Sequence, residues 1–188
     1  AVGYDLYCKM LNEAVRSIQG EKIEEEVFET TVDMDMDAFI PATYIKNEVQ
    51  KLDIYKRIAE IENEEELMDM QEELADRFGD LPDAVNNLLN IALIKSTCHS
   101  VYVASLVKKG NEVTLTMYPK AKLAVEKFPE LLIKYQNSLK LVPQANPYFV
   151  YWLPSNPKGK SDNMNIFTNL KKLLEDFKLL LEEKRKKE

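Results

Sequence analysis

Two periodicities of apolar residues divide the chain into a helical first half and a more strand-like second half. Apolar positions recur every three or four residues in 4–18, 45–59 and 63–78, and again after Pro82 as far as Cys98, which predicts four amphipathic helices. Residues 21–26 are acidic and predict a solvated linker. Residues 27–40 alternate apolar with polar side chains, as expected for a half-buried strand.

The second half is richer in β-branched and aromatic residues. Residues 101–107 and 113–117 flank Gly110-Asn111, a two-residue turn signal, and predict an antiparallel hairpin. A helix over 123–135 is expected to be interrupted by Pro129, and two short strands are expected at 139–142 and 148–153. A polar loop over 154–163 precedes a long final helix and a charged tail. The fold class is therefore α+β, with amphipathic helices packed on a small, mainly antiparallel sheet.

The helix over 63–78 carries clear signals at both ends. Asn63 can cap its start, and Glu66 three residues later completes a capping box. Gly79 is well placed as the left-handed residue that ends it. Phe78 closes an apolar stripe along this helix and is expected to be buried.

Charge is distributed very unevenly along the chain. Residues 1–94 hold 8 Lys and Arg against 23 Asp and Glu, whereas residues 95–188 hold 17 against 9. The acidic half is unsuited to DNA phosphate and favours a basic protein partner. Nucleic-acid binding stays open for the basic half, where the aromatic run 148–152 precedes Lys158 and Lys160, although such a run is more often a packed strand.

No pattern of catalytic or metal-binding residues is complete. The Gly-Lys-Ser that ends at Ser161 resembles a phosphate-binding loop, but Pro154 stands where the first glycine is needed. Asp33, Asp35 and Asp37 copy the start of a calcium loop, without its later Gly and Glu. We therefore expect no catalytic residue, metal or cofactor. The two cysteines, Cys8 and Cys98, and the lone His99 are expected to be structural.

Targeting signals are also missing from the sequence. No apolar stretch approaches the roughly 18 residues of a membrane helix, and the first residues lack the pattern of a signal peptide. We expect a cytoplasmic protein without membrane contact. The start in mid-pattern, without Met, suggests a fragment of a longer chain.

Residues 39–95 contain short sequence words in a fixed order. They are Ile40-Pro-Ala-Thr-Tyr-Ile45, Lys51-Leu-Asp-Ile-Tyr-Lys-Arg-Ile-Ala59, Glu66-Leu67, Glu73-Leu-Ala-Asp-Arg-Phe-Gly-Asp-Leu-Pro82 and Leu88-Leu-Asn-Ile-Ala92. This series resembles the C-terminal domain of bacterial transcription-repair coupling factors, the Mfd family. Residues 3–18 are similar to the segment that enters that domain from the motor. Beyond about residue 100 only the alternation of strands and helices matches.

The resemblance implies a division of the chain and a non-catalytic role. Residues 1–26 would be the helix and acidic linker that enter from the motor region, and residues 27–188 the C-terminal regulatory domain. The family is an ATP-driven translocase on double-stranded DNA that removes stalled RNA polymerase and recruits UvrA. Its last domain packs on an N-terminal UvrB-like module of the same protein, hides the UvrA-binding surface and so causes autoinhibition.

The resemblance also implies where that contact lies. The acidic residues of the contact fall on Glu73 and Asp76, three positions apart on one helical face, where they could meet arginines of the partner module. Arg77, Phe78 and Gly79 form the helix end that supports them. A nucleic-acid-binding accessory module, using the basic second half, remains the alternative.

Overall fold

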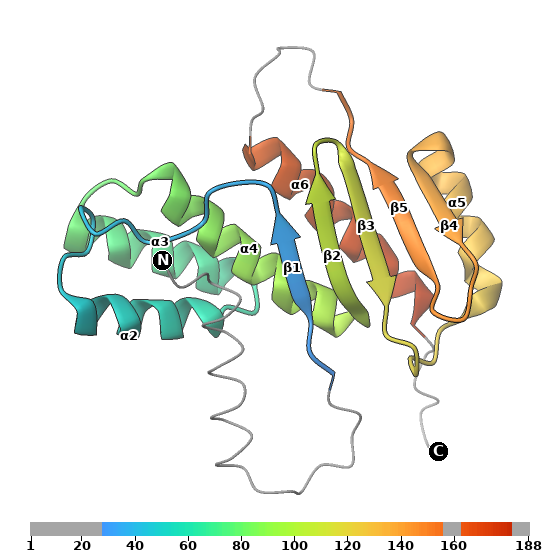
Figure 1. The fold of residues 1–188 in the computed structure, drawn as a ribbon, viewed down its shortest axis with the longest axis horizontal. Helices are drawn as coiled ribbons and strands as arrows, with labels where there is room; N and C mark the ends of the chain where they lie inside the picture. The colour runs from blue at the N-terminus through green and yellow to red at the C-terminus, as the bar shows by residue number, and fades with distance from the viewer. Residues whose placement is uncertain (1–27, 156–162, 182–188) are drawn as a thin grey trace, which may run out of the picture. The chain divides into compact units, whose positions relative to one another are not determined.

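A computed structural model describes residues 28–155 and 163–181 (Figure 1). The predicted helix over 4–18, the acidic linker over 21–26, most of the polar loop and the charged tail lie outside these residues. The described residues fall into two compact units. Of the described residues, the first unit contains 28–32 and 36–96, and the second contains 33–35, 97–155 and 163–181. The predicted boundary at residues 26 and 27 stays a prediction.

Helices build the first unit. They are α2 (Glu48–Ala59), α3 (Glu64–Phe78) and most of α4 (Asp83–Ser100), whose last turn belongs to the second unit. The Asn47 side chain caps α2 by accepting hydrogen bonds from the amides of Val49 and Gln50. The apolar stripes of α3, up to Leu74, and of α4 are buried, as the spacing predicts. In α2 the prediction is wrong for Val49 and Leu52, which are exposed, whereas Ile54 and Ile58 face the core. The core residues of the three helices include Ile54, Ile58, Leu67, Met70, Leu74, Val85, Leu88 and Leu89.

A five-stranded sheet in the order β1-β2-β3-β5-β4 is the framework of the second unit, although the first two residues of β1 are counted with the first unit. Its strands are β1 (Thr31–Met34), β2 (Val103–Lys109), β3 (Glu112–Met117), β4 (Leu139–Val142) and β5 (Tyr148–Trp152). The pairs β2–β3, β3–β5 and β4–β5 are antiparallel. Figure 1 shows β1 pointing the same way as β2, so the sheet is mixed. The expected strand over 27–40 is thus only four residues long.

The hairpin of β2 and β3 confirms its turn signal. Lys109 pairs with Glu112, which leaves Gly110 and Asn111 as the two-residue loop. Gly110 has a φ of +60°, a conformation that glycine adopts without steric cost.

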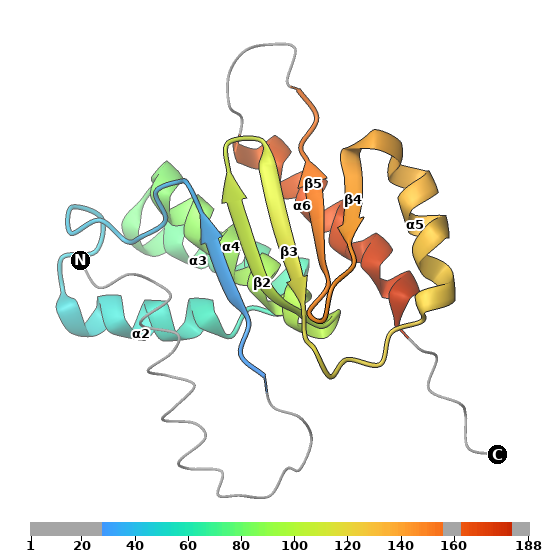
Figure 2. The same ribbon diagram turned by 45° about the vertical axis from the view of Figure 1, so that its right-hand side comes forward.

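Helices of the second unit cover one face of its sheet. Both views show α6 (Asn163–Phe177) running behind the central strands, with α5 (Phe128–Tyr135) beside β4 (Figures 1 and 2). Phe149 of β5 contacts Phe177 of α6 with ring centroids 5.0 Å apart, and both rings are buried. The α+β fold class is therefore confirmed.

Pro129 does not interrupt a helix, contrary to the sequence expectation. It lies in the first turn of α5, where the missing amide hydrogen leaves no helical hydrogen bond unmade. The segment before it forms a short 3₁₀ turn over Val125–Lys127. Further 3₁₀ turns occupy Gln136–Ser138 and Lys178–Leu180, so the predicted last helix ends earlier than its apolar pattern. None of the helices described is both long and apolar enough to cross a membrane.

Candidate protein-docking face of helix α3

The start of α3 is fixed by side-chain caps. Asn63 accepts a hydrogen bond from the Glu66 amide at 2.9 Å, as predicted. The Glu66 carboxylate in turn accepts the amide of Glu62 at 2.8 Å, one residue earlier than in the usual reciprocal box. Together these bonds satisfy two amides that would otherwise have no partner at the helix start.

The end of α3 is closed by Gly79 and Tyr44. Gly79 has φ +87° and ψ −171°, so φ is positive as predicted, but ψ lies outside the left-handed helical region. This combination is almost restricted to glycine. The Tyr44 hydroxyl donates to the carbonyl oxygens of Gly79, at 2.8 Å, and Leu74, at 3.1 Å. The last turn therefore has a defined geometry.

Acidic side chains follow one stripe along α3, at successive spacings of three, four and three residues. This periodicity keeps them on one face of a helix. Three of them, Glu66, Asp69 and Glu73, also line a cleft shared with α2, whereas Asp76 lies beyond the cleft towards the helix end. We call these residues the acidic stripe. Its members are Glu66, Asp69, Glu73 and Asp76.

Glu73 is held by two arginines of the same chain. Its carboxylate forms a two-point ion pair with the Arg57 guanidinium of α2, in which Nη2 lies 2.6 Å from Oε1. Arg77, one turn later on α3, donates to the same carboxylate at 3.1 Å. The Arg57 hydrogen bonds are the main cause that lowers the pKa of Glu73 to about 2. Glu73 therefore stays ionised at neutral pH.

Asp76 is in a different situation from Glu73. Its side chain is exposed, and within the described ranges it has neither a hydrogen-bond nor an ion-pair partner. Asp69 is exposed as well. The two predicted contact residues thus share a helix face, but only Asp76 presents an uncompensated charge to solvent.

Phe78 is half-buried, so the expectation that it belongs to the core is wrong. It is the last residue of α3, where the helix leaves the packed interior, and its ring meets Tyr44 edge-on at 5.8 Å. The guanidinium carbon of Arg77 lies 4.9 Å from the centre of the Phe78 ring. Arg77 is therefore positioned by a carboxylate and an aromatic face at once.

A cleft of about 270 Å³ lies between the end of α2 and the acidic stripe. Ile61 and Met70 form its apolar floor, and both are buried. Among the described residues that line it, Arg57 is the only cation, against four carboxylates. The cleft is anionic with an apolar base, which suits the aliphatic stem and charged head of a Lys or Arg side chain. Its acidic lining residues are Glu60, Glu66, Asp69 and Glu73.

Sequence reasoning missed the role of Arg57. It is 16 positions from Glu73 and belongs to a different helix, so no local spacing connects the two. The only local signal for this ion pair was weak: Arg57 is a basic residue in the last turn of α2, next in sequence to the buried Ile58. The sequence likewise shows that this region is rich in acidic residues, but it does not predict that four of them line one cleft.

The residues that imitate catalytic or metal motifs have structural surroundings. Asp35 accepts from Lys108 Nζ at 2.5 Å and from the Gly110 amide at 2.8 Å. Cys98 is fully buried, which raises the pKa of its thiol. No group of three or more His, Cys, Asp or Glu side chains in the described segments could hold a metal ion.

The fold and this face define an α+β domain whose first unit presents an acidic helix beside a cleft. A model of the TRCF domain matches residues 34–128, which is half of the chain. The chain therefore belongs to the TRCF domain family.

Known proteins agree with this assignment. The chain is 40% identical over 122 residues to the transcription-repair-coupling factor of Staphylococcus haemolyticus, an alignment that covers 64% of this chain and 10% of that protein. With the Bacillus subtilis factor it shares 36% identity over 126 residues, covering 67% of this chain and 11% of that protein. The chain thus spans about a tenth of the length of the curated relatives it matches.

A solved structure supports the fold as well. A crystal structure of the C-terminal domain of transcription-repair coupling factor superposes with a TM-score of 0.64 at 28% sequence identity. The match covers 80% of this chain and 94% of that one. The chain is accordingly the counterpart of the C-terminal domain of these factors.

Proposed function

We propose that this chain is a non-catalytic, autoinhibitory domain of a cytoplasmic transcription-repair coupling factor. It would dock on the N-terminal UvrB-like module of the same protein and mask the surface that binds UvrA. RNA polymerase and double-stranded DNA would be partners of the parent protein rather than of this domain. The observation that carries the proposal is the acidic stripe on α3, in a chain of this family, with Asp76 exposed and uncompensated.

The contact would be made by arginines of the UvrB-like module. A carboxylate without a partner in its own domain gains more from an incoming guanidinium than one that is already paired. Asp76 and Asp69 meet this condition better than Glu73, whose charge is shared with Arg57 and Arg77. We assign the direct contact mainly to Asp76, with Glu73 contributing from the cleft side.

Glu73 would act chiefly by keeping the docking face in shape. Its pairing with Arg57 ties α2 to α3, and its pairing with Arg77 aligns the helix end next to Asp76. Replacing Glu73 by Arg would bring three guanidinium groups together and disturb the fold locally. Glu73 is therefore a poor choice for a charge-reversal test, whereas Asp76 is a good one.

The test measures UvrA capture by full-length coupling factor that carries this domain. Wild type, a protein lacking this domain, Asp76→Arg and a control, Glu130→Arg on α5, are compared. Loss of a charge pair at an interface can cost roughly 2–5 kcal/mol, and about 1.4 kcal/mol already changes a closed-to-open ratio tenfold. Deletion should unmask UvrA binding, Asp76→Arg should approach the deletion, and Glu130→Arg should behave as wild type.

Other outcomes would contradict parts of the proposal. If deletion unmasks binding but Asp76→Arg does not, another face docks. If neither changes UvrA capture, the autoinhibitory role is wrong. If the isolated chain instead binds DNA with an affinity that falls steeply with salt, the alternative of a nucleic-acid-binding module in the basic half is favoured.

A further inference from the structure

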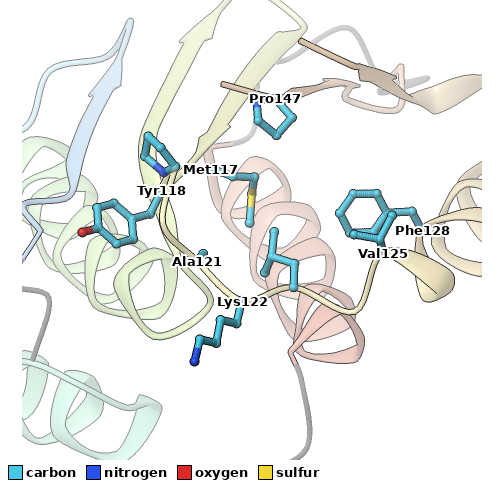
Figure 3. A pocket seen from close by; sticks show the side chains of 9 residues that line it. Met117, Tyr118, Ala121, Lys122, Val125, Phe128 and Pro147 are labelled. Carbon is cyan, nitrogen blue, oxygen red and sulfur yellow. The ribbon is translucent and has the colours of Figure 1, made fainter. Parts of the chain in front are cut away.

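A second cavity lies in the second unit, at the end of β3 where the chain leaves the sheet. Its volume is about 310 Å³. In Figure 3, Met117, Val125, Phe128 and Pro147 surround it, while the amino group of Lys122 extends away from it. The cavity belongs to a different unit from the acidic stripe and has no part in the function proposed above.

The walls of this cavity are held in place by backbone hydrogen bonds. The Tyr118 amide donates to the Tyr102 carbonyl at 2.7 Å, and the Ala124 amide donates to the Leu180 carbonyl at 2.7 Å. Leu123 also forms an isolated antiparallel bridge with Leu181. The segment from Tyr118 to Ala124 is therefore anchored at both ends, although it forms neither helix nor strand. A preformed cavity avoids part of the ordering cost of binding.

The residues that line the cavity are mostly apolar, and the charge beside them is positive. Met117 and Phe128 are buried at the base, whereas Val125, at the edge, is 66% exposed. Among the described residues of the lining, Lys122 is the only charged one, and Lys120 is exposed two positions before it. No carboxylate of residues 28–155 or 163–181 lines the cavity. An exposed apolar surface next to exposed cations favours a ligand with the opposite pattern.

We infer that this cavity is a docking site for an acidic segment of a partner protein that inserts a large apolar side chain. The volume lies at the lower end of the range of about 300–1,000 Å³ for ligand sites, which suits one or two side chains. The apolar residue would fill the space between Met117 and Phe128. Flanking carboxylates would lie near Lys122 and Lys120, in the arrangement of an apolar centre with a charged rim.

The test titrates the whole 188-residue chain with capped hexapeptides and follows its amide signals by NMR. One peptide has Leu-Phe flanked on each side by two glutamates. In a second peptide two serines replace Leu-Phe, and in a third lysines replace the glutamates. Only the first should shift the signals of residues 117–128 in a saturable way, and added salt should weaken its binding because exposed charges are screened.

Two variants at the edge of the cavity test the apolar contact and the charge contact separately. Val125→Ser should weaken the acidic peptide about tenfold through lost apolar burial, and Lys122→Gln about threefold through a lost exposed ion pair. Both residues are exposed, so the fold should be kept. The matched controls are Ile133→Ser, at a residue of α5 that is 74% exposed, and Lys140→Gln on β4, and neither residue lines the cavity. These controls should bind as wild type.

Several results would overturn the inference. The first is the absence of saturable shifts at millimolar acidic peptide. The second is binding of the serine or lysine peptide with the same affinity as the acidic peptide. The third is an unchanged affinity of the acidic peptide for Val125→Ser. Stronger shifts of the same residues by a single-stranded oligonucleotide would assign the cavity to nucleic acid instead. None of these results depends on whether α3 docks to a UvrB-like module, so the two proposals fail separately.

Discussion

Arg57 of α2 and Glu73 of α3 form a two-point ion pair, with Nη2 to Oε1 at 2.6 Å. The pair joins two helices that share a cleft and brings the guanidinium of one against the acidic stripe of the other. Glu73, which the family resemblance assigns to a partner contact, is thus engaged within its own domain. Which carboxylate of the stripe is available to a partner depends on this pairing.

The coupling between Arg57 and Glu73 can be measured with a double-mutant cycle of Arg57→Met and Glu73→Gln. About a third of each side chain is exposed, at 39% and 34%, so solvent screening limits the pair. We expect a coupling of about 1 kcal/mol in the free energy of unfolding by urea. The control cycle uses Lys51 and Glu48, which approach only to 3.9 Å with Glu48 largely exposed, and should give almost none. Equal coupling in both cycles would mean that the two-point geometry contributes nothing.

Acid should weaken the domain partly through Glu73. Its pKa is about 2 in the folded chain because of Arg57, below the ordinary value of 4.5. A carboxyl group with a lowered folded pKa stabilises the fold above its unfolded pKa, and this contribution is lost as pH falls from about 4.5 towards 2. Between pH 5 and 2.5, the free energy of unfolding should therefore fall less in Glu73→Gln than in wild type.

Glu72→Gln is the control for this pH dependence. Glu72 is the neighbouring carboxylate on α3 and its side chain is exposed. The variant should follow the wild-type pH profile. If Glu73→Gln also follows it, the ion pair with Arg57 does not form in solution.

Phe78 should matter less to stability than Leu74, one turn earlier. Leu74 is fully buried, and Leu→Ala at such sites costs about 2–5 kcal/mol. Phe78 is half-buried and loses mainly its edge contact with Tyr44 and its contact with Arg77, so Phe78→Ala should cost about 1–2 kcal/mol. Urea denaturation of the two variants decides the order. A larger loss for Phe78→Ala would mean that its ring is buried in solution.

The elements that sequence predicts well are those with local causes. Asn63 caps α3 because its side chain needs only an amide three residues away. Gly110 turns the hairpin because the φ of a single residue decides it. Both signals lie within four positions of the structure they specify, and both are confirmed.

The features that sequence missed have non-local causes. The partner of Glu73 comes from another helix, and the half-burial of Phe78 depends on where Tyr44 meets the end of α3. Apolar periodicity gives the buried face of a helix but not the position along it at which the core ends. The cavity beside Met117 is lined in part by Pro147, from the turn before β5. Because these residues are far apart in the sequence, no local pattern predicts the cavity.

Lys108 provides the last prediction, because it is a buried cation whose partner is largely exposed. Only 7% of its side chain is accessible, against 46% for Asp35. The two residues are bonded by Lys108 Nζ to Asp35 Oδ1 at 2.5 Å, and the Asp35 amide donates to the Lys108 carbonyl at 3.3 Å. Burial alone would raise the pKa of Asp35, but the hydrogen bonds from Lys108 and the Gly110 amide lower it.

The two partners should therefore respond unequally to replacement. Asp35→Ala leaves the buried ammonium of Lys108 without its carboxylate and should cost about 2–3 kcal/mol, somewhat less than for a fully buried pair, since the lysine stem can still reach towards water. Lys108→Met removes the charge from the buried site, keeps the volume of the stem and leaves Asp35 partly solvated, so it should cost less than about 1 kcal/mol. Asp33→Ala, at an exposed position of β1, is the control and should be nearly neutral.

Urea denaturation of the three variants gives the comparison. Equal losses of unfolding free energy for Asp35→Ala and Lys108→Met would show that the pair acts as a simple surface salt bridge. A larger loss for Lys108→Met would show that the ammonium group itself stabilises the contact between β2 and the end of β1.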